Sequence, residues 1–328
     1  MTRRALPHFA ASPCYALLAA LILLVVRLAP AQDAVTRAEA AVRQAVTAKE
    51  RSFALIDLGR AYLAAGEGDK AEAEFKAALT EDAGNSVAYL DLGQLRLTQR
   101  RIPEAEQEFR QAIRIAPQAG SGYAALAEVL IQTDRAPQAR QLLEKAVALD
   151  PADWHSQYRL AVVLLEAGEA ARAADLLEKV ARLRPDFLPA REQLGLALVR
   201  RRDLKGATAA GQALIAKNPQ AAEGHRIMAL VLWKQHDDDG SLAECALALA
   251  SDPNSTQMQT LQALELWQLD RKKDARIAFV QAAKGSFGPK LATAEIFCRL
   301  LLCDASDIAV VDEFLRKNRW AIMPASEP

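Results

Sequence analysis

The sequence is poor in aromatic residues, and its charges balance. Only 5% of the 328 residues are aromatic although 51% are hydrophobic, which suits many small helix-to-helix contacts better than one large core. Lysine plus arginine equals aspartate plus glutamate at 41 each. No basic stripe with interleaved aromatics occurs in the sequence, so we expect no nucleic-acid partner.

Motifs that perform catalysis or hold metals are also scarce. Beyond residue 31 the only histidines are His155, His225 and His236, and the sequence lacks a nucleophile elbow, a glycine-rich phosphate loop and an H-E-x-x-H pair. The acidic run 236–240 lacks the alternating ligand spacing of a calcium loop, which favours a solvated turn over a cation site. We therefore expect no enzyme, no cofactor and no metal.

The amino-terminal segment carries a long apolar run. Two arginines precede the apolar residues 14–26, and Ala29 and Ala31 supply the small residues that a signal peptidase needs. This pattern predicts a secretory signal over residues 1–31 and a periplasmic or secreted protein. An uncleaved membrane anchor stays open, because the apolar character extends back to Phe9. In that case the rest of the chain would lie outside the cytoplasm, held to the membrane.

Prolines recur at a fixed interval of 34 residues. A spacing held this strictly indicates a tandem array in which each proline ends the second helix of a helical hairpin. The prolines are Pro117, Pro151, Pro185, Pro219 and Pro253, and they divide the chain into seven units: 52–85, 86–119, 120–153, 154–187, 188–221, 222–255 and 256–287.

The same residue types recur in each unit at the positions where two helices would touch. The eighth and twentieth positions are small in every unit, and the seventh and twenty-fourth are apolar in most. The eighth positions are Gly59, Gly93, Ala127, Ala161, Gly195, Ala229 and Ala263, and the twentieth are Ala71, Ala105, Ala139, Ala173, Ala207, Ser241 and Ala275. The twenty-fourth are Phe75, Phe109, Leu143, Leu177, Gly211, Cys245 and Phe279.

This register closely resembles the tetratricopeptide repeat (TPR) family over residues 52–287. The resemblance implies an all-α fold, namely a right-handed TPR α-solenoid of about seven helix–turn–helix repeats. Terminal repeats need a polar outer face because nothing stacks on them. We therefore predict an amino-terminal capping helix over residues 33–51. Residues 288–328 are predicted to form a degenerate eighth repeat or carboxy-terminal cap, followed by a tail.

The resemblance also implies a binding groove. In TPR proteins the first helix of each repeat lines a concave groove with its positions two, five, nine, twelve and thirteen. The groove residues carried over in this way include Phe53, Ile56, Arg60, Leu90, Gln94, Leu97, Glu128, Gln132, Leu165, Glu192 and Gln268. The remaining members, which we select as the partner-binding residues, are Tyr158, Glu166, Arg200, Arg226, Trp233, Lys234 and Trp267.

Two groups of groove residues have alternative roles. Trp233 and Trp267 occupy position twelve of consecutive repeats, where they would anchor a peptide or instead pack into the seam between repeats. Arg200, Arg226 and Lys234 would meet a carboxylate of a partner or instead form ion pairs with nearby glutamates.

The second helix of the fifth repeat is predicted to be weak. Gly206 and Gly211 lie within it, and Gly211 stands where other repeats place a larger side chain. Each interior glycine costs about 1 kcal/mol of helix stability relative to alanine. We expect residues 204–216 to open early and a leucine at Gly211 to slow this opening if the site has room.

The sequence therefore predicts a non-catalytic protein–protein interaction scaffold of the cell envelope that binds a partner protein or peptide in the TPR groove. An alternative is an accessory or carrier subunit of an envelope polysaccharide or secretion system, which would bind glycan by stacking on the same two tryptophans.

Overall fold

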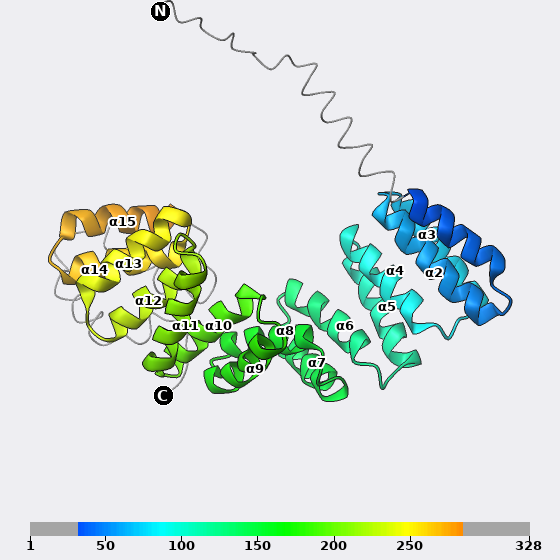
Figure 1. Cartoon of the computed structure of the whole chain (residues 1–328), viewed down its shortest axis with the longest axis horizontal. Helices are drawn as coiled ribbons and strands as arrows, with labels where there is room; N and C mark the ends of the chain where they lie inside the picture. Colours follow the sequence, from blue (N-terminus) through cyan, green and yellow to red (C-terminus); the bar gives the residue numbers. More distant parts are fainter. Residues whose placement is uncertain (1–31, 285–328) are drawn as a thin grey trace, which may run out of the picture. The chain divides into compact units, whose positions relative to one another are not determined.

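The computed structural model describes residues 32–284, and the regular elements within this range are helices joined by short turns (Figure 1). The predicted signal or anchor and the predicted carboxy-terminal cap lie outside the described residues. The chain divides into two compact units, Met1–Asp150 (unit 1) and Pro151–Pro328 (unit 2), and each is described by itself. None of the helices over residues 32–284 is long and apolar enough to cross a membrane.

The helices follow one another as antiparallel pairs. Unit 1 contains a helix over residues 32–44, then α2 (Ala48–Ala64), α3 (Gly68–Glu81), α4 (Ser86–Thr98), α5 (Ile102–Ile115), α6 (Gly120–Gln132) and α7 (Ala136–Leu149). Unit 2 contains α8 (Trp154–Glu166), α9 (Ala170–Leu183), α10 (Leu188–Arg200), α11 (Leu204–Lys217), α12 (Ala222–Lys234), α13 (Asp238–Ser251), α14 (Thr256–Gln268) and α15 (Lys272–Lys284).

The predicted period is confirmed by the helix starts. From α4 to α14, every first helix of a pair begins at the first residue of its predicted repeat. The first repeat differs, because α2 begins at Ala48 rather than at residue 52. Thr47 and Glu50 form a capping box there, in which the Thr47 Oγ1 accepts from the Glu50 N–H at 3.1 Å and the Glu50 carboxylate accepts from the Thr47 N–H at 3.0 Å.

That capping box corrects the prediction of one capping helix over residues 33–51. The first helix ends at residue 44, and the residues from Ala48 onward belong to α2. The short helix still covers the end of the array, because Val35 packs against Leu58 and Ala61 of α2.

The predicted helix contacts form the core. All seven residues at position twenty are fully buried. A Cβ added at Gly59 or at Gly93 would lie 2.5 Å from the ring of Phe75 or Phe109 of the same repeat, so those rings require glycine at position eight. Where position twenty-four holds the smaller Leu143 or Leu177, position eight is alanine.

Two glycines of the fifth repeat face side chains of the next repeat. A Cβ added at Gly195 would lie 2.4 Å from the Ile227 Cδ1, and one added at Gly211 would lie 3.1 Å from the Met228 Sδ. Both neighbours belong to α12 of the next repeat, so side chains of α12 occupy the space that the glycines leave. The site above Gly211 therefore has no room for a leucine, so the condition under which a leucine would slow the opening is not met.

In several repeats, the side chain at position four forms a hydrogen bond with the turn that precedes the first helix. The donor reaches back six residues to the carbonyl oxygen of the periodic proline, at distances of 2.6 to 3.1 Å. The pairs are Tyr123–Pro117 in unit 1 and Gln157–Pro151, His225–Pro219 and Gln259–Pro253 in unit 2. Because the donor varies while its partner carbonyl does not, this position tolerates several side chains that can donate a hydrogen bond.

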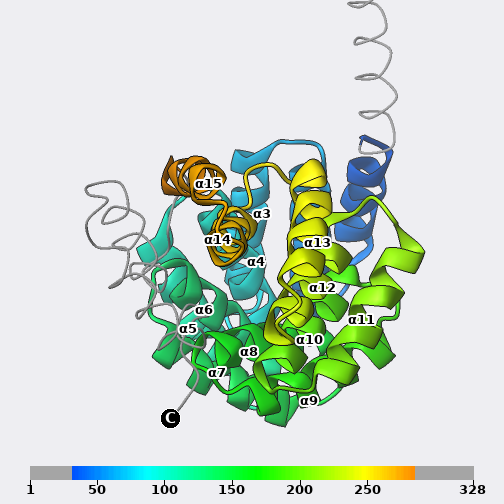
Figure 2. The ribbon, with the colours of Figure 1, turned by 90° about the vertical axis from the view of Figure 1, so that its left-hand side faces the viewer.

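First helices also contact one another directly. In unit 1, α4 packs against both α2 and α6, and in unit 2, α10 packs against both α8 and α12. Figure 2 shows the neighbouring positions of α10 and α12. Corresponding positions of successive first helices therefore lie side by side within each unit.

Candidate functional site

The candidate site is, within each unit, the surface formed by positions two, five, nine, twelve and thirteen of the first helices, here called the first-helix face of that unit. The predicted groove residues differ in how far they are exposed to solvent. The exposed members are Phe53, Arg60, Gln94, Gln132, Glu166 and Gln268, and the half-buried ones are Leu90, Leu97, Glu128, Tyr158, Glu192, Arg200 and Arg226. The buried members are Ile56, Leu165, Trp233, Lys234 and Trp267.

In unit 1, an exposed ring lies on the same helix face as a fixed guanidinium. Phe53 on α2 is 43% exposed, although most large apolar side chains of the described residues are covered. Arg60, two turns further along α2, donates from its Nε to the Asp91 Oδ2 on α4 at 2.7 Å. Burial raises the pKa of Asp91, and the bond from Arg60 partly offsets this rise. The ion pair joins the first helices of two successive repeats.

In unit 2, position five forms a row across three first helices. The row consists of Tyr158 on α8, Glu192 on α10 and Arg226 on α12. The Arg226 Nη2 donates to the Glu192 Oε1 at 2.5 Å, and its Nη1 lies 3.8 Å from the Asp252 Oδ2. Burial raises the pKa of Glu192, and the charge of Arg226 opposes this rise. Arg226 therefore pairs with Glu192 within the protein, which was the alternative to binding a carboxylate of a partner.

An aromatic group lies beside this row, and of its members only Tyr158 was predicted from the sequence. The rings of Tyr158 and Phe187 meet edge to face at 5.0 Å, and Trp154 meets Phe187 at 4.8 Å. The Arg184 guanidinium lies 4.6 Å from the centroid of the Trp154 ring. Trp154 and Phe187 hold positions one and thirty-four, which the resemblance does not assign to a groove, but the 34-residue period itself places both at the start of a first helix.

The two predicted tryptophan anchors are buried. Trp233 is 3% exposed and Trp267 is 6% exposed. The Lys234 Nζ lies 4.3 Å from the centroid of the Trp233 ring, and the Lys272 Nζ lies 5.2 Å from that of Trp267. This burial is what packing in the seam between repeats requires. It also leaves neither ring with the open face on which a sugar would stack.

Arg200 forms a hydrogen bond with the first helix of the preceding repeat. Its Nη1 donates to the Leu165 carbonyl oxygen at 2.8 Å, in the last turn of α8, where a positive charge is favoured by the helix dipole. Burial lowers the pKa of Arg200, and the charge of Glu166 opposes this effect. Arg200 therefore joins α10 to α8, while Glu166 itself is exposed on the first-helix face.

The acidic run 236–240 is a turn and helix cap. His236 has a positive φ of 65°, and the Asp237 Oδ1 accepts from the Gly240 N–H at 3.0 Å at the start of α13. Within residues 32–284, no group of three or more histidine, cysteine, aspartate or glutamate side chains is placed to hold a metal ion.

Family models match most of the described chain. One tetratricopeptide repeat model matches residues 20–86, 56–120 and 192–256, and a second matches residues 96–161 and 130–194. The chain therefore belongs to the tetratricopeptide repeat family, whose stacked repeats offer extended binding surfaces to other proteins. The search of curated proteins returned no match.

Solved TPR structures share the fold. A tetratricopeptide repeat protein from Parabacteroides merdae has a TM-score of 0.58 at 13% identity, covering 76% of this chain and 98% of its own. The pilF protein of Pseudomonas aeruginosa has a TM-score of 0.54 at 21% identity, covering 69% of this chain and 99% of its own. YrrB, described as a TPR protein with an unusual peptide-binding site, has a TM-score of 0.51 at 19% identity, covering 55% and 93%.

Proposed function

We propose that this protein is a non-catalytic scaffold of the cell envelope that binds a peptide or helix of a partner protein on its first-helix face. The observation that carries the proposal is the aromatic surface left on that face within each unit: in unit 1 Phe53 is 43% exposed on α2, and in unit 2 Tyr158 is half-buried on α8. Aromatic side chains held on a rigid surface are frequent anchors of protein interfaces. The peptide-binding site described for YrrB agrees with this use of the fold.

Ion pairs across the face support binding to a preformed surface. Arg60 joins α2 to α4 in unit 1, and Arg226 joins α12 to α10 in unit 2. Side chains that are already fixed lose less conformational freedom when a partner binds, so more of the contact energy appears as affinity. An extended segment or an amphipathic helix is the partner chemistry that suits a surface built from parallel rows of helical side chains.

We expect Phe53→Ala and Tyr158→Ala each to weaken partner binding by about 2 kcal/mol, because each truncation removes an anchor ring. The measurement is capture of partners by the full mature chain, identification by mass spectrometry, and calorimetry with the purified partner. Leu247→Ala is the matched control, since Leu247 is 50% exposed on α13, a second helix. Equal loss of binding in Leu247→Ala, or none in the two aromatic variants, would contradict the proposed face.

The proposed location rests on the apolar run and on Ala29 and Ala31. We expect the mature protein to begin at or near Gln32, which amino-terminal sequencing of the protein recovered from its host would show. Ala31→Arg should leave the precursor uncut, because a bulky charged residue replaces a small one at the cleavage site. Recovery of the full-length wild-type chain in the membrane fraction after salt extraction would contradict cleavage and indicate an anchor.

A further inference from the structure

His225 is a buried histidine with a hydrogen-bond acceptor at each ring nitrogen. It lies at position four of α12 and is only 6% exposed. Its Nε2 lies 2.9 Å from the Pro219 carbonyl oxygen, in the turn before α12. Its Nδ1 lies 2.7 Å from the Glu244 Oε2 on α13, the second helix of the same repeat. The imidazole therefore bridges three segments: the turn that ends repeat five, and α12 and α13 of repeat six.

The number of protons on this ring decides whether both contacts hold. A carbonyl oxygen and a carboxylate are both acceptors, so each ring nitrogen must donate a proton to form its bond. Neutral imidazole carries one N–H and can serve only one of the two acceptors. The doubly protonated imidazolium serves both, and its positive charge meets the negative charge of Glu244.

Other charged groups around α12 do not take the place of Glu244. Within the described residues, Glu244 is the charged group whose atoms lie within hydrogen-bonding distance of the imidazole. The remaining titratable or charged residues on the helices packed against α12 are Arg191, Glu192 and Arg200 on α10, Lys205 and Lys217 on α11, and Asp238, Asp239 and Cys245 on α13. On α12 itself they are Glu223, Arg226 and Lys234. Burial raises the pKa of the Cys245 thiol to about 12, so it stays neutral through the range in which a histidine titrates.

We propose that protonated His225 is a pH-sensitive latch that holds α12 to α13 and to the turn at Pro219. Loss of one proton removes one of the two hydrogen bonds, because the deprotonated ring nitrogen then presents its lone pair to an acceptor oxygen. If the remaining proton stays on Nε2, the bond to Pro219 survives and the contact with Glu244 becomes repulsive. The expected response is local loosening between α12 and α13. This inference does not depend on the proposed partner binding, because it concerns the internal packing of repeat six against the turn that precedes it.

The direction of the pH effect follows from the contacts of the ring. Burial by itself lowers the pKa of His225, but the hydrogen bonds to Pro219 and Glu244 outweigh it, and the pKa of His225 is raised above its usual 6.5. A raised pKa means that the folded protein holds this proton more tightly than the unfolded chain does. The contribution to stability is therefore complete below about pH 6.5 and is lost as the pH rises through the pKa of the folded state.

The sequence offers a matched substitution. Gln157 and Gln259 occupy position four in two other repeats of unit 2 and donate to their proline carbonyls at 2.7 and 2.6 Å. His225→Gln is therefore expected to keep the bond to Pro219 while removing the titrating group. Glu244→Gln is the second variant, because it keeps the ring and removes the charge opposite Nδ1.

The test uses the full mature chain in three forms: wild type, His225→Gln and Glu244→Gln. Denaturant unfolding from about pH 6 to about pH 9 should show the unfolding equilibrium constant of wild type rising several-fold relative to His225→Gln at the same pH. His155 and His236 are exposed and present in both proteins, so they do not contribute to this difference. A wild-type to His225→Gln difference that does not change with pH would overturn the latch.

Nuclear magnetic resonance of the ring nitrogens gives the independent readout. In wild type, His225 should carry protons on both nitrogens at pH about 6 and titrate above the ordinary histidine value, and Glu244→Gln should move this titration downward. A neutral His225 with a single N–H at pH about 6 would overturn the proposal even if the His225→Gln variant were unstable.

Discussion

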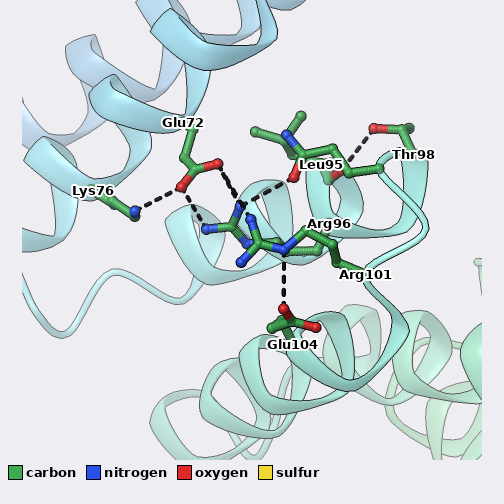
Figure 3. A network of polar contacts seen from close by, with 8 residues as sticks. Glu72, Lys76, Leu95, Arg96, Thr98, Arg101 and Glu104 are labelled. Carbon is green, nitrogen blue, oxygen red and sulfur yellow. Dashed lines mark hydrogen bonds and ion pairs between the residues drawn. The ribbon is translucent and has the colours of Figure 1, made fainter.

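Replacing Glu72 with alanine is expected to destabilise unit 1 by about 3 kcal/mol, because it leaves a buried guanidinium without its counter-charge. The Arg96 side chain on α4 is only 5% exposed and donates to both oxygens of Glu72 on α3, at 2.5 and 2.7 Å. The Lys76 Nζ lies 2.7 Å from the same carboxylate. Figure 3 shows Glu72 as the acceptor at the centre of this network.

The control for Glu72→Ala is Glu104→Ala in the same network. Glu104 accepts from the Arg101 Nε at 3.0 Å, but both side chains are more than 40% exposed, and exposed pairs contribute about 1 kcal/mol or less. Denaturant unfolding of the full chain, followed by amide exchange in α3 and α4, measures both variants. Equal destabilisation by the two substitutions would show that the burial of Arg96 is not what makes Glu72 important.

Acid should weaken the same contact in the wild-type protein. The hydrogen bonds from Arg96, and then from Lys76, lower the pKa of Glu72 from 4.5 to about 2. The folded state therefore binds this proton less tightly than the unfolded chain does. The stabilising contribution is present above pH 4.5 and is lost as the pH falls toward 2. Glu72→Ala should flatten this part of the stability profile more than Glu104→Ala does, although the pKa of Glu104 is also lowered, by a hydrogen bond from its own backbone and by one from Arg101.

The repeat architecture was predictable because its constraint is local and is repeated in every unit. A small residue at position twenty, such as Ala71 or Ala207, is needed wherever two helices of a pair touch, and all seven such positions are buried. The break between the first helix and α2 was not predicted. It depends on the reciprocal bonds of Thr47 and Glu50, whose capping box begins a new helix within the residues that were predicted to form one.

The candidate site was less predictable, because position in a repeat does not determine exposure. Trp233 and Phe53 both fall on the first-helix face, yet the first is 3% exposed and the second 43%. A side chain at the end of the array has fewer neighbours to cover it than one between two repeats. Likewise, the choice of Arg226 between Glu192 and an outside carboxylate depends on a contact between residues 34 positions apart, which the sequence does not specify.

Gly224→Ala is expected to destabilise unit 2 by about 2 kcal/mol, since overpacking costs about 3 kcal/mol and the gain in helix propensity returns about 1. A Cβ at Gly224 on α12 would lie 2.9 Å from both the Gly211 carbonyl oxygen and the Ile215 N of α11. These are backbone atoms, so they can move away only if the two helices separate.

Gly211→Ala tests the same contact from the opposite helix. A Cβ at Gly211 would lie 3.1 Å from the Met228 Sδ and 3.3 Å from the Gly224 carbonyl oxygen, and a methionine side chain can rotate away. We therefore expect Gly211→Ala to change stability by less than about 1 kcal/mol, whereas Gly211→Leu should be clearly destabilising.

Denaturant unfolding and amide exchange across α11 and α12 would measure all three variants. If Gly211→Ala proves as harmful as Gly224→Ala, the close approach of the two backbones is not what sets the cost. If residues 204–216 exchange no faster than α7 or α9, Met228 and Ile227 of α12 compensate for the interior glycines of α11.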